Sequence, residues 1–196
     1  MVVIREEIPA DYDAVRELNC AAFDGDQEAQ LVDLLRSDGA VVVALVAVEN
    51  DEIVGHILFS DLLIEAEQAV LHAVSLAPMA VLPDHQRRGI GSALVRQGLA
   101  ICRERGKSIV VVLGHPAYYP RFGFSAELAQ NLLLTRDSAR NMTIFQQDVQ
   151  HQPLTDSING YRISGMQGRY SGFRCEKRLY RADIMVRGVK SDVRLT

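Results

Sequence analysis

The chain has 196 residues, of which 48% are hydrophobic and 23% charged, and its formal net charge is −4. This composition is typical of a globular protein, and its acidic balance argues against a nucleic-acid partner because no general positive field would attract phosphate backbones. No apolar run approaches about 18 residues, and the amino terminus turns acidic where a signal peptide turns apolar. We therefore expect a cytoplasmic, unprocessed protein that has no membrane partner.

The cysteines and histidines predict no metal site. Cys20, Cys102 and Cys175 lie far apart and form no CxxC pair, so they indicate neither a disulfide framework nor a zinc cage. None of the five histidines stands in an HxxxH or HExxH spacing. We expect buried or idle thiols and no bound metal.

The amino-terminal segment predicts a strand followed by two helices. Residues 2–6 alternate as a strand. Apolar residues recur at helical spacing in residues 10–23 and again in residues 31–35. Asp24 or Asp26 can cap the second of these helices.

Three long apolar runs come next and predict an antiparallel meander. They cover residues 40–48, 53–64 and 69–82, are rich in β-branched residues and are joined by short polar turns. Pro78 lies inside the third run. Because proline cannot donate to a hydrogen-bond ladder, we expect a bulge or a splayed strand there.

The stretch PDHQRRGIGSALVRQG, residues 83–98, follows the meander and leads into a helix. Apolar residues on one face predict that helix over residues 92–105, and a short apolar run predicts a buried strand over residues 108–114. Strand, glycine loop, helix and strand form a crossover unit. The strand 108–114 should therefore lie beside the third run and parallel to it.

Two familiar nucleotide motifs do not fit this stretch. A Walker loop needs GxxxxGK[ST], but Lys107 is the only lysine among the first 125 residues. A Rossmann fingerprint needs a glycine at the sixth position of GIGSAL, where Leu94 stands. The phosphate ligand of this loop, if it has one, is of another kind.

The remaining features favour a pyrophosphate group. A helix amino terminus supplies backbone donors, Gly89 and Gly91 let the main chain approach a ligand, and Arg87 and Arg88 stand beside it. The alternative is that the two glycines only make a tight turn between strand and helix, with both arginines solvated.

At this point the sequence resembles a known family. QRRGIGS, residues 86–92, resembles the Q/R-x-x-G-x-G/A signature of the GNAT superfamily of acetyl-CoA-dependent N-acetyltransferases, and the order of elements over residues 1–125 is similar. EAQLVDLLRSDG, LAPMAVLPDHQRRGIGSALV and LGHPAYYPRFGF resemble one group of small bacterial predicted acetyltransferases. The resemblance implies an α/β (α+β) fold: a mixed, mostly antiparallel central sheet with flanking helices, splayed at its fourth strand, which is the third strand of the meander.

The resemblance implies acetyl-CoA as co-substrate, without a metal, and assigns two sets of backbone groups to it. Met79, Ala80 and Val81 would hydrogen-bond the pantetheine arm, because a splayed strand exposes unpaired N–H and C=O groups. The amides of the loop would cradle the pyrophosphate, at Arg87, Arg88, Gly89, Ile90, Gly91 and Ser92.

The resemblance also implies a catalytic acid. Tyr119 stands where the family often places a tyrosine that protonates the departing thiolate, and Tyr118 is the alternative. A phenol can do so because its ordinary pKa, about 10, lies above that of a thiol, about 8.5. Tyr119 could instead simply pack in a short helix. Where many members carry an asparagine, this chain reads Gly114, His115 and Pro116; His115 could act on cofactor or substrate, or be structural.

The general base and the acceptor are left open. An alkylammonium must lose a proton before it attacks a thioester, and Asp61, Glu65, His72 or an ordered water could take it; each side chain could equally be a surface or packing residue. The acceptor is expected to be a primary amine of a small molecule or a peptide, and a homodimer is left open.

The carboxy-terminal part departs from this pattern. Residues 1–125 hold 10 basic and 18 acidic residues, whereas residues 126–196 hold 11 basic and 7 acidic residues. We expect an acetyl-CoA-binding N-acetyltransferase domain over residues 1–130 and an atypical, basic segment over residues 131–196, for which poor order is one alternative. Within it, residues 161–173 could form a hairpin and residues 181–189 a strand.

Two functions therefore stand at this stage. The first is an acetyl-CoA-dependent N-acetyltransferase that works by direct attack of a primary amine. The second is a non-catalytic acyl-CoA-binding or regulatory module, because the last strand pair of the family is not recognisable beyond Leu134 and the strand 108–114 would keep an open apolar edge. A flavodoxin-like fold is disfavoured by the consecutive hairpins.

Overall fold

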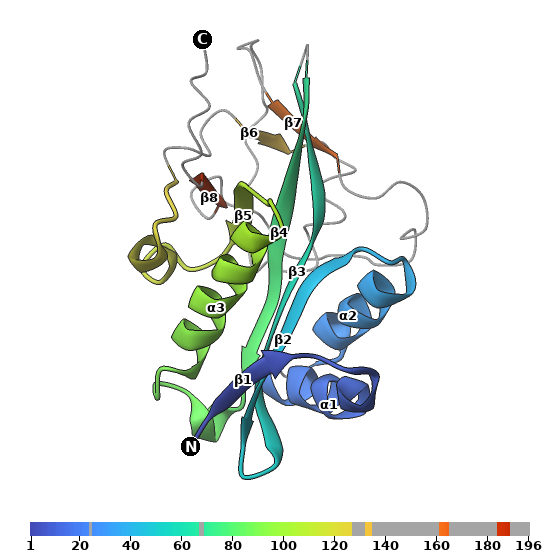
Figure 1. Cartoon of the computed structure of the whole chain (residues 1–196), viewed down its shortest axis with the longest axis vertical. Helices are drawn as coiled ribbons and strands as arrows, with labels where there is room; N and C mark the ends of the chain where they lie inside the picture. Colours follow the sequence, from blue (N-terminus) through green and yellow to red (C-terminus); the bar gives the residue numbers. More distant parts are fainter. Residues whose placement is uncertain (24, 67–68, 127–131, 135–160, 165–183, 189–196) are drawn as a thin grey trace. The chain divides into compact units, whose positions relative to one another are not determined.

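The computed structural model describes residues 1–23, 25–66, 69–126, 132–134, 161–164 and 184–188 (Figure 1). The chain forms two compact units, one of Met1–Ser60 with Leu76–Gly106 and one of Asp61–Ser75 with Lys107–Thr196. Strands run in the order β1-β2-β3-β4-β5-β8, and β6 and β7 lie off this path. The mixed, mostly antiparallel sheet with flanking helices that the sequence predicted is confirmed. The predicted domain boundary at residue 130 stays a prediction.

The first unit contains the predicted strand, the two early helices, the meander and the helix after the glycine loop. Its elements are β1 Val3–Glu6, the 3₁₀ helix η1 Pro9–Asp11, α1 Tyr12–Phe23, α2 Gln27–Ser37, β2 Val41–Glu49, most of β3 Glu52–Ala66, the end of β4 Ala69–Val81, the 3₁₀ helix η2 Pro83–His85 and α3 Ile90–Glu104. Asp26, one of the two expected residues, stands at the N-cap position of α2, but its side chain makes no capping hydrogen bond.

The antiparallel pairing begins at a short turn. Asn50 and Asp51 have φ angles of 51° and 64°, the conformation of a two-residue hairpin turn that follows the twist of its strands. β2 pairs with β3 in the register Leu45↔Ile57, and β1 pairs with the other edge of β2 in the register Ile4↔Ala47. β4 runs through Pro78, whose peptide bond with Ala77 is cis. The splay at this strand stays a prediction.

Helices cover both faces of these strands. In Figure 1, α3 lies on one side of β2 and β3, and α1 and α2 lie on the other. Phe59 of β3 is fully buried, and a Cβ at Gly98 of α3 would come within 2.7 Å of its ring carbon Cζ. The glycine therefore allows α3 to lie directly on this ring, whose burial contributes about 1.5–3 kcal/mol.

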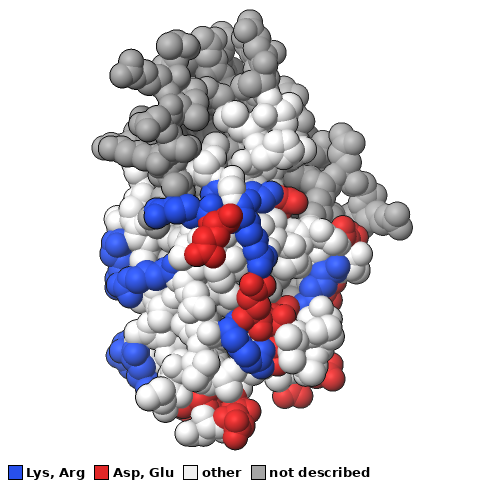
Figure 2. Space-filling view, viewed as in Figure 1, with Lys and Arg blue, Asp and Glu red and all other residues white. Residues whose placement is uncertain are grey.

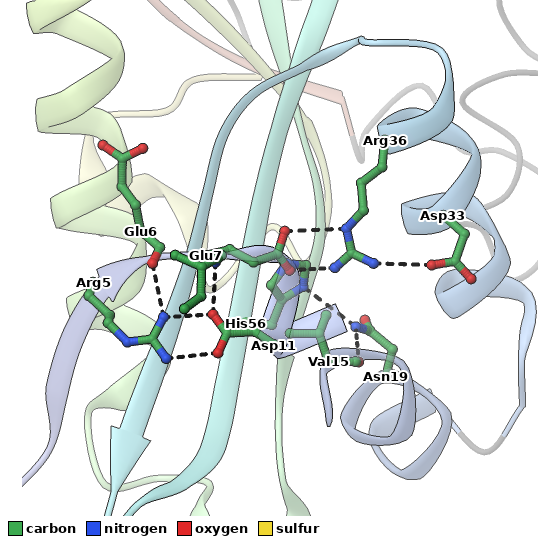
Figure 3. A network of polar contacts seen from close by, with 10 residues as sticks. Arg5, Glu6, Glu7, Asp11, Val15, Asn19, Asp33, Arg36 and His56 are labelled. Atoms are coloured by element: carbon green, nitrogen blue, oxygen red, sulfur yellow. Dashed lines mark hydrogen bonds and ion pairs between the residues drawn. The ribbon is translucent and has the colours of Figure 1, made fainter. Parts of the chain in front are cut away.

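A buried ion pair fixes α2 to the end of β1 (Figure 3). Arg36 of α2 binds both carboxylate oxygens of Glu7, through Nη2 and through Nε at 3.3 Å, and the two side chains are 9% and 5% exposed. Arg36 also donates to Asp33, one turn earlier. Burial raises the pKa of Glu7, and the Arg36 guanidinium acts in the opposite direction.

His56 of β3 lies behind this pair and is fully buried. Its Nε2 is 3.5 Å from Oε1 of Glu7, and its Nδ1 is 3.5 Å from Nδ2 of Asn19 in α1. Both distances are too long for strong hydrogen bonds. Burial, assisted by the positive charge of Arg36, lowers the pKa of His56 to about 3. The imidazole is therefore neutral at physiological pH.

In the second unit, β5 Ile109–Leu113 pairs antiparallel with β8 Ile184–Gly188 in the register Val111↔Val186. β8 confirms the strand expected within residues 181–189. The expectation that the strand 108–114 keeps an open edge is wrong, because the backbone of β8 pairs along that edge. The basic composition of the sequence around β8 concealed this partner strand. β5 and β4 are neighbours, as expected.

Two further short strands belong to the carboxy-terminal segment. β7 Tyr161–Ser164 pairs antiparallel with the end of β3, in the register Leu63↔Ser164, and parallel with β6 Leu132–Leu134. β7 is the first half of the hairpin expected over residues 161–173, and the second half lies outside the described residues. The expectation of poor order over 131–196 also falls mostly on residues outside the described ranges.

Candidate cofactor-binding site

The loop between β4 and α3 has the backbone of an anion site. Arg87 and Gly89 both have positive φ angles, 59° and 86°. Left-handed residues in a turn are one way in which successive backbone N–H groups come to face the same anion. Arg87 adopts this conformation at a cost of about 1–2 kcal/mol, since its Cβ crowds the backbone. Strain of this size in an exposed loop points to a functional constraint.

The loop leads directly into the start of α3. Gly89 is the N-cap residue and has no side chain to cap the helix. The first helical hydrogen bond runs from N of Ala93 to O of Gly89, at 3.0 Å. The amides of Ile90 and Gly91 precede it and have no acceptor within the helix. This helix terminus therefore offers backbone donors and the positive end of a helix dipole to an anion.

Several contacts hold the loop against the sheet. Gln86 donates from Nε2 to the carbonyl of Val81, at 3.1 Å, and N of Leu82 donates to O of Val54, at 3.0 Å. Ile90 is 4% exposed, and a Cβ at Gly55 would lie 3.1 Å from its Cγ2. The missing side chain at Gly55 thus lets the start of α3 pack closely on β3.

The two loop arginines differ in their contacts. Arg88 donates from Nη2 to Oε1 of Glu49, at 2.7 Å. The other carboxylate oxygen of Glu49 is 3.5 Å from Nε2 of His85. The hydrogen bond from Arg88 lowers the pKa of Glu49. Arg87, by contrast, forms no ion pair within the described part of the chain.

Charges elsewhere on the surface are mixed. On the face drawn in Figure 2, the side chains of Lys and Arg are interspersed with those of Asp and Glu. On this face, no uniform positive field would attract an anion.

The residues expected to hold the cofactor belong to one continuous segment of the first unit. Met79, Ala80 and Val81 form the end of β4, and the loop and the first turn of α3 hold the remainder, Arg87 to Ser92. Ala80 is 2% exposed, whereas Met79 and Val81 are half-buried. The contact of these three residues with pantetheine stays a prediction.

Tyr119 begins a short 3₁₀ helix of the second unit, η3 Tyr119–Phe122, and is 7% exposed. Its ring makes edge-to-face contacts with Tyr118 and Phe124, at centroid distances of 5.1 and 5.6 Å. Burial raises the pKa of Tyr119, so its phenol keeps its proton at neutral pH. The packing alternative for Tyr119 describes its surroundings correctly, and its role as an acid stays a prediction.

Gly114 explains one departure from the family pattern. A Cβ at this position would lie 2.9 Å from Cδ2 of Tyr119 and closer still to Cε2, so an asparagine at Gly114 would collide with that ring. His115 is exposed and its carbonyl accepts the N–H of Tyr118, at 2.9 Å. Arg121 lies 4.6 Å over the ring of Tyr118.

The candidate bases are not distinguished by their surroundings. Asp61 is 56% exposed and pairs with Lys107 at 2.6 Å. His72 is exposed, and Glu65 pairs through its backbone with Arg162 of β7.

Sequence reasoning did not single out Glu49, Glu7 or His56 as candidates. Only His56 carried a signal, a histidine inside the apolar run IVGHILF, which indicates burial. Glu49 contacts its arginine across 39 positions of the chain, so no local pattern marks it.

Among the described residues, no group of three or more His, Cys, Asp or Glu side chains could hold a metal ion. Within the same ranges, no helix has both the length and the apolar character required to cross a bilayer. Cys102 is buried and Cys20 half-buried, and neither forms a disulfide bond within the described residues.

Comparison with known proteins shows which family the chain is similar to. The family model described as an acetyltransferase (GNAT) domain matches residues 3–126. The Escherichia coli K12 protein named uncharacterized N-acetyltransferase YhbS is 36% identical over 160 residues, which are 81% of this chain and 92% of that protein. The E. coli protein named uncharacterized N-acetyltransferase YjhQ is 38% identical over 117 residues, 59% of this chain and 65% of that protein.

Solved structures agree as well. The crystal structure of E. coli YhbS in complex with CoA matches with a TM-score of 0.63 at 36% identity, over 68% of this chain and 74% of that one. A GNAT family acetyltransferase from Brucella melitensis in complex with acetyl-CoA matches with a TM-score of 0.60 at 39% identity, over 65% of this chain and 84% of that one. With a matching family model and relatives of this identity and coverage, the chain belongs to the GNAT acetyltransferase family.

Proposed function

We propose that the protein is an acetyl-CoA-dependent N-acetyltransferase that transfers an acetyl group to a primary amine by direct attack. The observation that carries the proposal is the loop at the start of α3, where Arg87 and Gly89 are left-handed and the helix has no side-chain cap. The amino terminus of a helix can bind a pyrophosphate through its backbone N–H groups, and two similar proteins have been solved with CoA or acetyl-CoA. The amine belongs to a small molecule or a peptide, and the enzyme acts in the cytoplasm.

The loop residues would bind the cofactor and take no part in bond making. Backbone N–H groups of Gly89, Ile90 and Gly91 donate to the pyrophosphate, and the end of β4 at Met79 to Val81 satisfies the amides of the pantetheine arm. When bound, acetyl-CoA supplies an activated acyl group as a thioester. These contacts would orient the thioester toward the amine. Its reaction with a bound amine is then effectively unimolecular rather than bimolecular.

Tyr119 would supply the proton that the departing sulfur takes up. Its raised pKa makes it a weaker acid than a phenol in water, which on its own would oppose the transfer. The same burial, however, disfavours a thiolate beside it, since desolvation penalises any anion. The difference in proton affinity between the phenol and the sulfur, rather than the pKa of Tyr119 alone, would decide the direction. As the nitrogen–carbon bond forms and the carbon–sulfur bond breaks, Oη of Tyr119 would pass its proton to the sulfur, and the proton that the attacking nitrogen loses would restore the phenol.

The amine must be unprotonated before it attacks, so it either binds as the neutral amine or loses its proton at the site. Asp61, Glu65, His72 or an ordered water stays the proposed acceptor of that proton. Each of these three side chains can be substituted in turn. The substitution that lowers kcat/KM most strongly at low pH would identify the base, because at higher pH the amine loses its proton to the solution and no longer needs a base from the protein.

The test is an assay of thiol release with acetyl-CoA and a panel of primary amines. The proposal predicts release that depends on both the amine and the enzyme, with acetylated amine formed in equal amount. Saturable binding of acetyl-CoA without amine-dependent release would favour the non-catalytic acyl-CoA-binding module instead.

A further inference from the structure

The two neighbouring arginines of the loop have different tasks. Arg88 is held by Glu49 at 2.7 Å, while Arg87 has no ion pair within the described ranges. Both stand directly before Gly89 and both are exposed. The two arginines carry like charges beside the same loop, but only Arg88 is held by a carboxylate within the described ranges.

Glu49 is placed by a rigid turn. It is the last residue of β2, directly before Asn50 and Asp51, whose positive φ angles close the hairpin in two residues. Its side chain is only 13% exposed. The carboxylate contacts His85 with one oxygen and Arg88 with the other, so it joins the residues at the two ends of the segment 85–88.

We propose that Glu49 is a positioning residue of the cofactor site, which holds Arg88 and thereby the left-handed turn at Arg87, and that Arg87 alone of the two arginines supplies charge to the phosphates of coenzyme A. This inference rests on the proposed function. Its physical basis is that Arg88 already has a carboxylate partner. Leaving that partner for a phosphate would exchange one charge-assisted hydrogen bond for another and release the turn.

If Arg88 rather than Arg87 bound the phosphates, Glu49→Gln would change the affinity for coenzyme A in the opposite direction. If Arg88 leaves Glu49 to bind a phosphate, Glu49→Gln frees that arginine and removes a competing negative charge, and affinity for coenzyme A rises. If Glu49 positions the loop, Glu49→Gln lowers affinity although it removes a negative charge next to an anion site. We expect a loss of roughly three- to fivefold, the size of a part-exposed ion pair.

The experiment is a calorimetric titration of coenzyme A into the full chain at two salt concentrations. The variants are Glu49→Gln, Arg88→Gln, their double variant and Arg87→Gln. Glu52→Gln is the matched control, because Glu52 is the exposed partner of Glu49 across the same hairpin. This substitution removes the same charge without removing the partner of Arg88. Thermal unfolding without ligand checks that each variant is folded.

Three results would support the inference together. The losses from Glu49→Gln and Arg88→Gln are similar and do not add in the double variant. Glu52→Gln does not weaken binding. Arg87→Gln weakens binding and reduces its dependence on salt, because a screened charge pair has been removed, whereas Arg88→Gln leaves that dependence near the wild-type value.

Other results would overturn it. Unchanged or tighter binding by Glu49→Gln excludes a positioning role, and an equal loss of salt dependence in Arg87→Gln and Arg88→Gln excludes the division of tasks. These outcomes leave the proposed function intact, since the wild-type chain still binds coenzyme A. A wild-type chain that does not bind it overturns the proposed function, and this inference with it.

Discussion

Gly89 is the residue on which the cofactor loop depends most directly. Its φ of 86° is one that residues with a side chain rarely adopt. No heavy atom outside its chain neighbours lies within 4 Å of where its Cβ would be. The position therefore has space for a side chain, and only the backbone conformation excludes one. Gly106, at the other end of α3, has the same properties with a φ of 73°, which makes the two glycines a matched pair.

We predict that Gly89→Val abolishes the thermal shift produced by acetyl-CoA, whereas Gly106→Val keeps it. Both variants should lose comparable stability without ligand, at least about 1–2 kcal/mol, because each forces a side chain into the left-handed region. Differential scanning fluorimetry with and without acetyl-CoA compares them. A retained shift in Gly89→Val, or a lost shift in Gly106→Val, would contradict the assignment of the loop.

Tyr119 is the second residue whose role can be isolated. We predict that Tyr119→Phe lowers kcat and leaves the affinity for acetyl-CoA nearly unchanged, because the substitution removes only the Oη proton while the buried ring keeps its contacts with Phe124 and Gly114. A general acid is worth roughly 10²–10⁴-fold in rate. Steady-state kinetics and a binding titration measure both quantities.

Tyr118→Phe is the control for this change, because the two phenols are adjacent and Tyr118 is less buried. It should keep most of the activity. Full activity in Tyr119→Phe would show that the acid assignment is wrong, and a loss confined to Tyr118→Phe would move the role to that neighbour.

At the scale of elements, α2 is joined to the sheet by one buried ion pair. Arg36 and Arg16 both bind Asp33, but Arg36 reaches Glu7 in the interior while Arg16, at 42% exposure, lies at the surface. Removing one partner of a buried pair leaves the other charge without compensation. The same deletion at the surface changes little.

We therefore predict that Arg36→Met lowers the free energy of unfolding by about 3–5 kcal/mol, and that Arg16→Met lowers it by less than about 1 kcal/mol. Urea unfolding measures both. The double variant Arg36→Met with Glu7→Gln should recover part of the loss, since no buried charge is then left unpaired. Equal effects of Arg36→Met and Arg16→Met would contradict the buried role of this pair.

The elements themselves were largely predictable, because their signals are local. The helix after the loop was expected at residue 92 and begins at Ile90, and the meander strands begin and end within a few residues of their expected positions. The loop before α3 was predictable for the same reason: its residues are contiguous, so one short motif contains them. Its role in binding the cofactor stays a prediction.

Contacts between distant parts of the chain were not predictable. Glu49 and Arg88 are 39 positions apart, and Glu7 and Arg36 are 29; neither pair leaves a periodic trace. β8 was recognised as a strand, but its pairing with β5 was missed. The sequence of a short strand with an arginine among apolar residues does not indicate which other strand it pairs with. The proton acceptor of the amine stays unassigned by sequence for the same reason.

At the scale of the whole molecule, stability should depend on pH through His56. Its pKa is lowered to about 3 in the folded state, whereas an unfolded chain binds the proton at its ordinary pKa, about 6.5. The unfolded state therefore binds more protons as the pH falls through this window, and stability is lost by up to about 1.4 kcal/mol per pH unit. Glu7 offsets part of this, because its raised pKa favours the folded state as it takes up a proton.

We predict that His56→Gln has a flatter dependence of the free energy of unfolding on pH, between pH 6.5 and 5, than the wild-type chain. His72→Gln is the control, because it makes the same substitution at an exposed histidine. Denaturant unfolding at a series of pH values gives both slopes. Parallel slopes for the wild-type chain and His56→Gln would show that His56 is not held neutral in the folded state.

The central claim is that this chain is a GNAT enzyme whose loop at the start of α3 binds coenzyme A. A calorimetric titration of acetyl-CoA into the wild-type chain, followed by thermal unfolding of the same samples, tests it most directly. The account predicts saturable binding at one site per chain, with stabilisation of about 2.7 kcal/mol when the ligand concentration is one hundred times Kd. No heat of binding and no thermal shift at millimolar acetyl-CoA would contradict it.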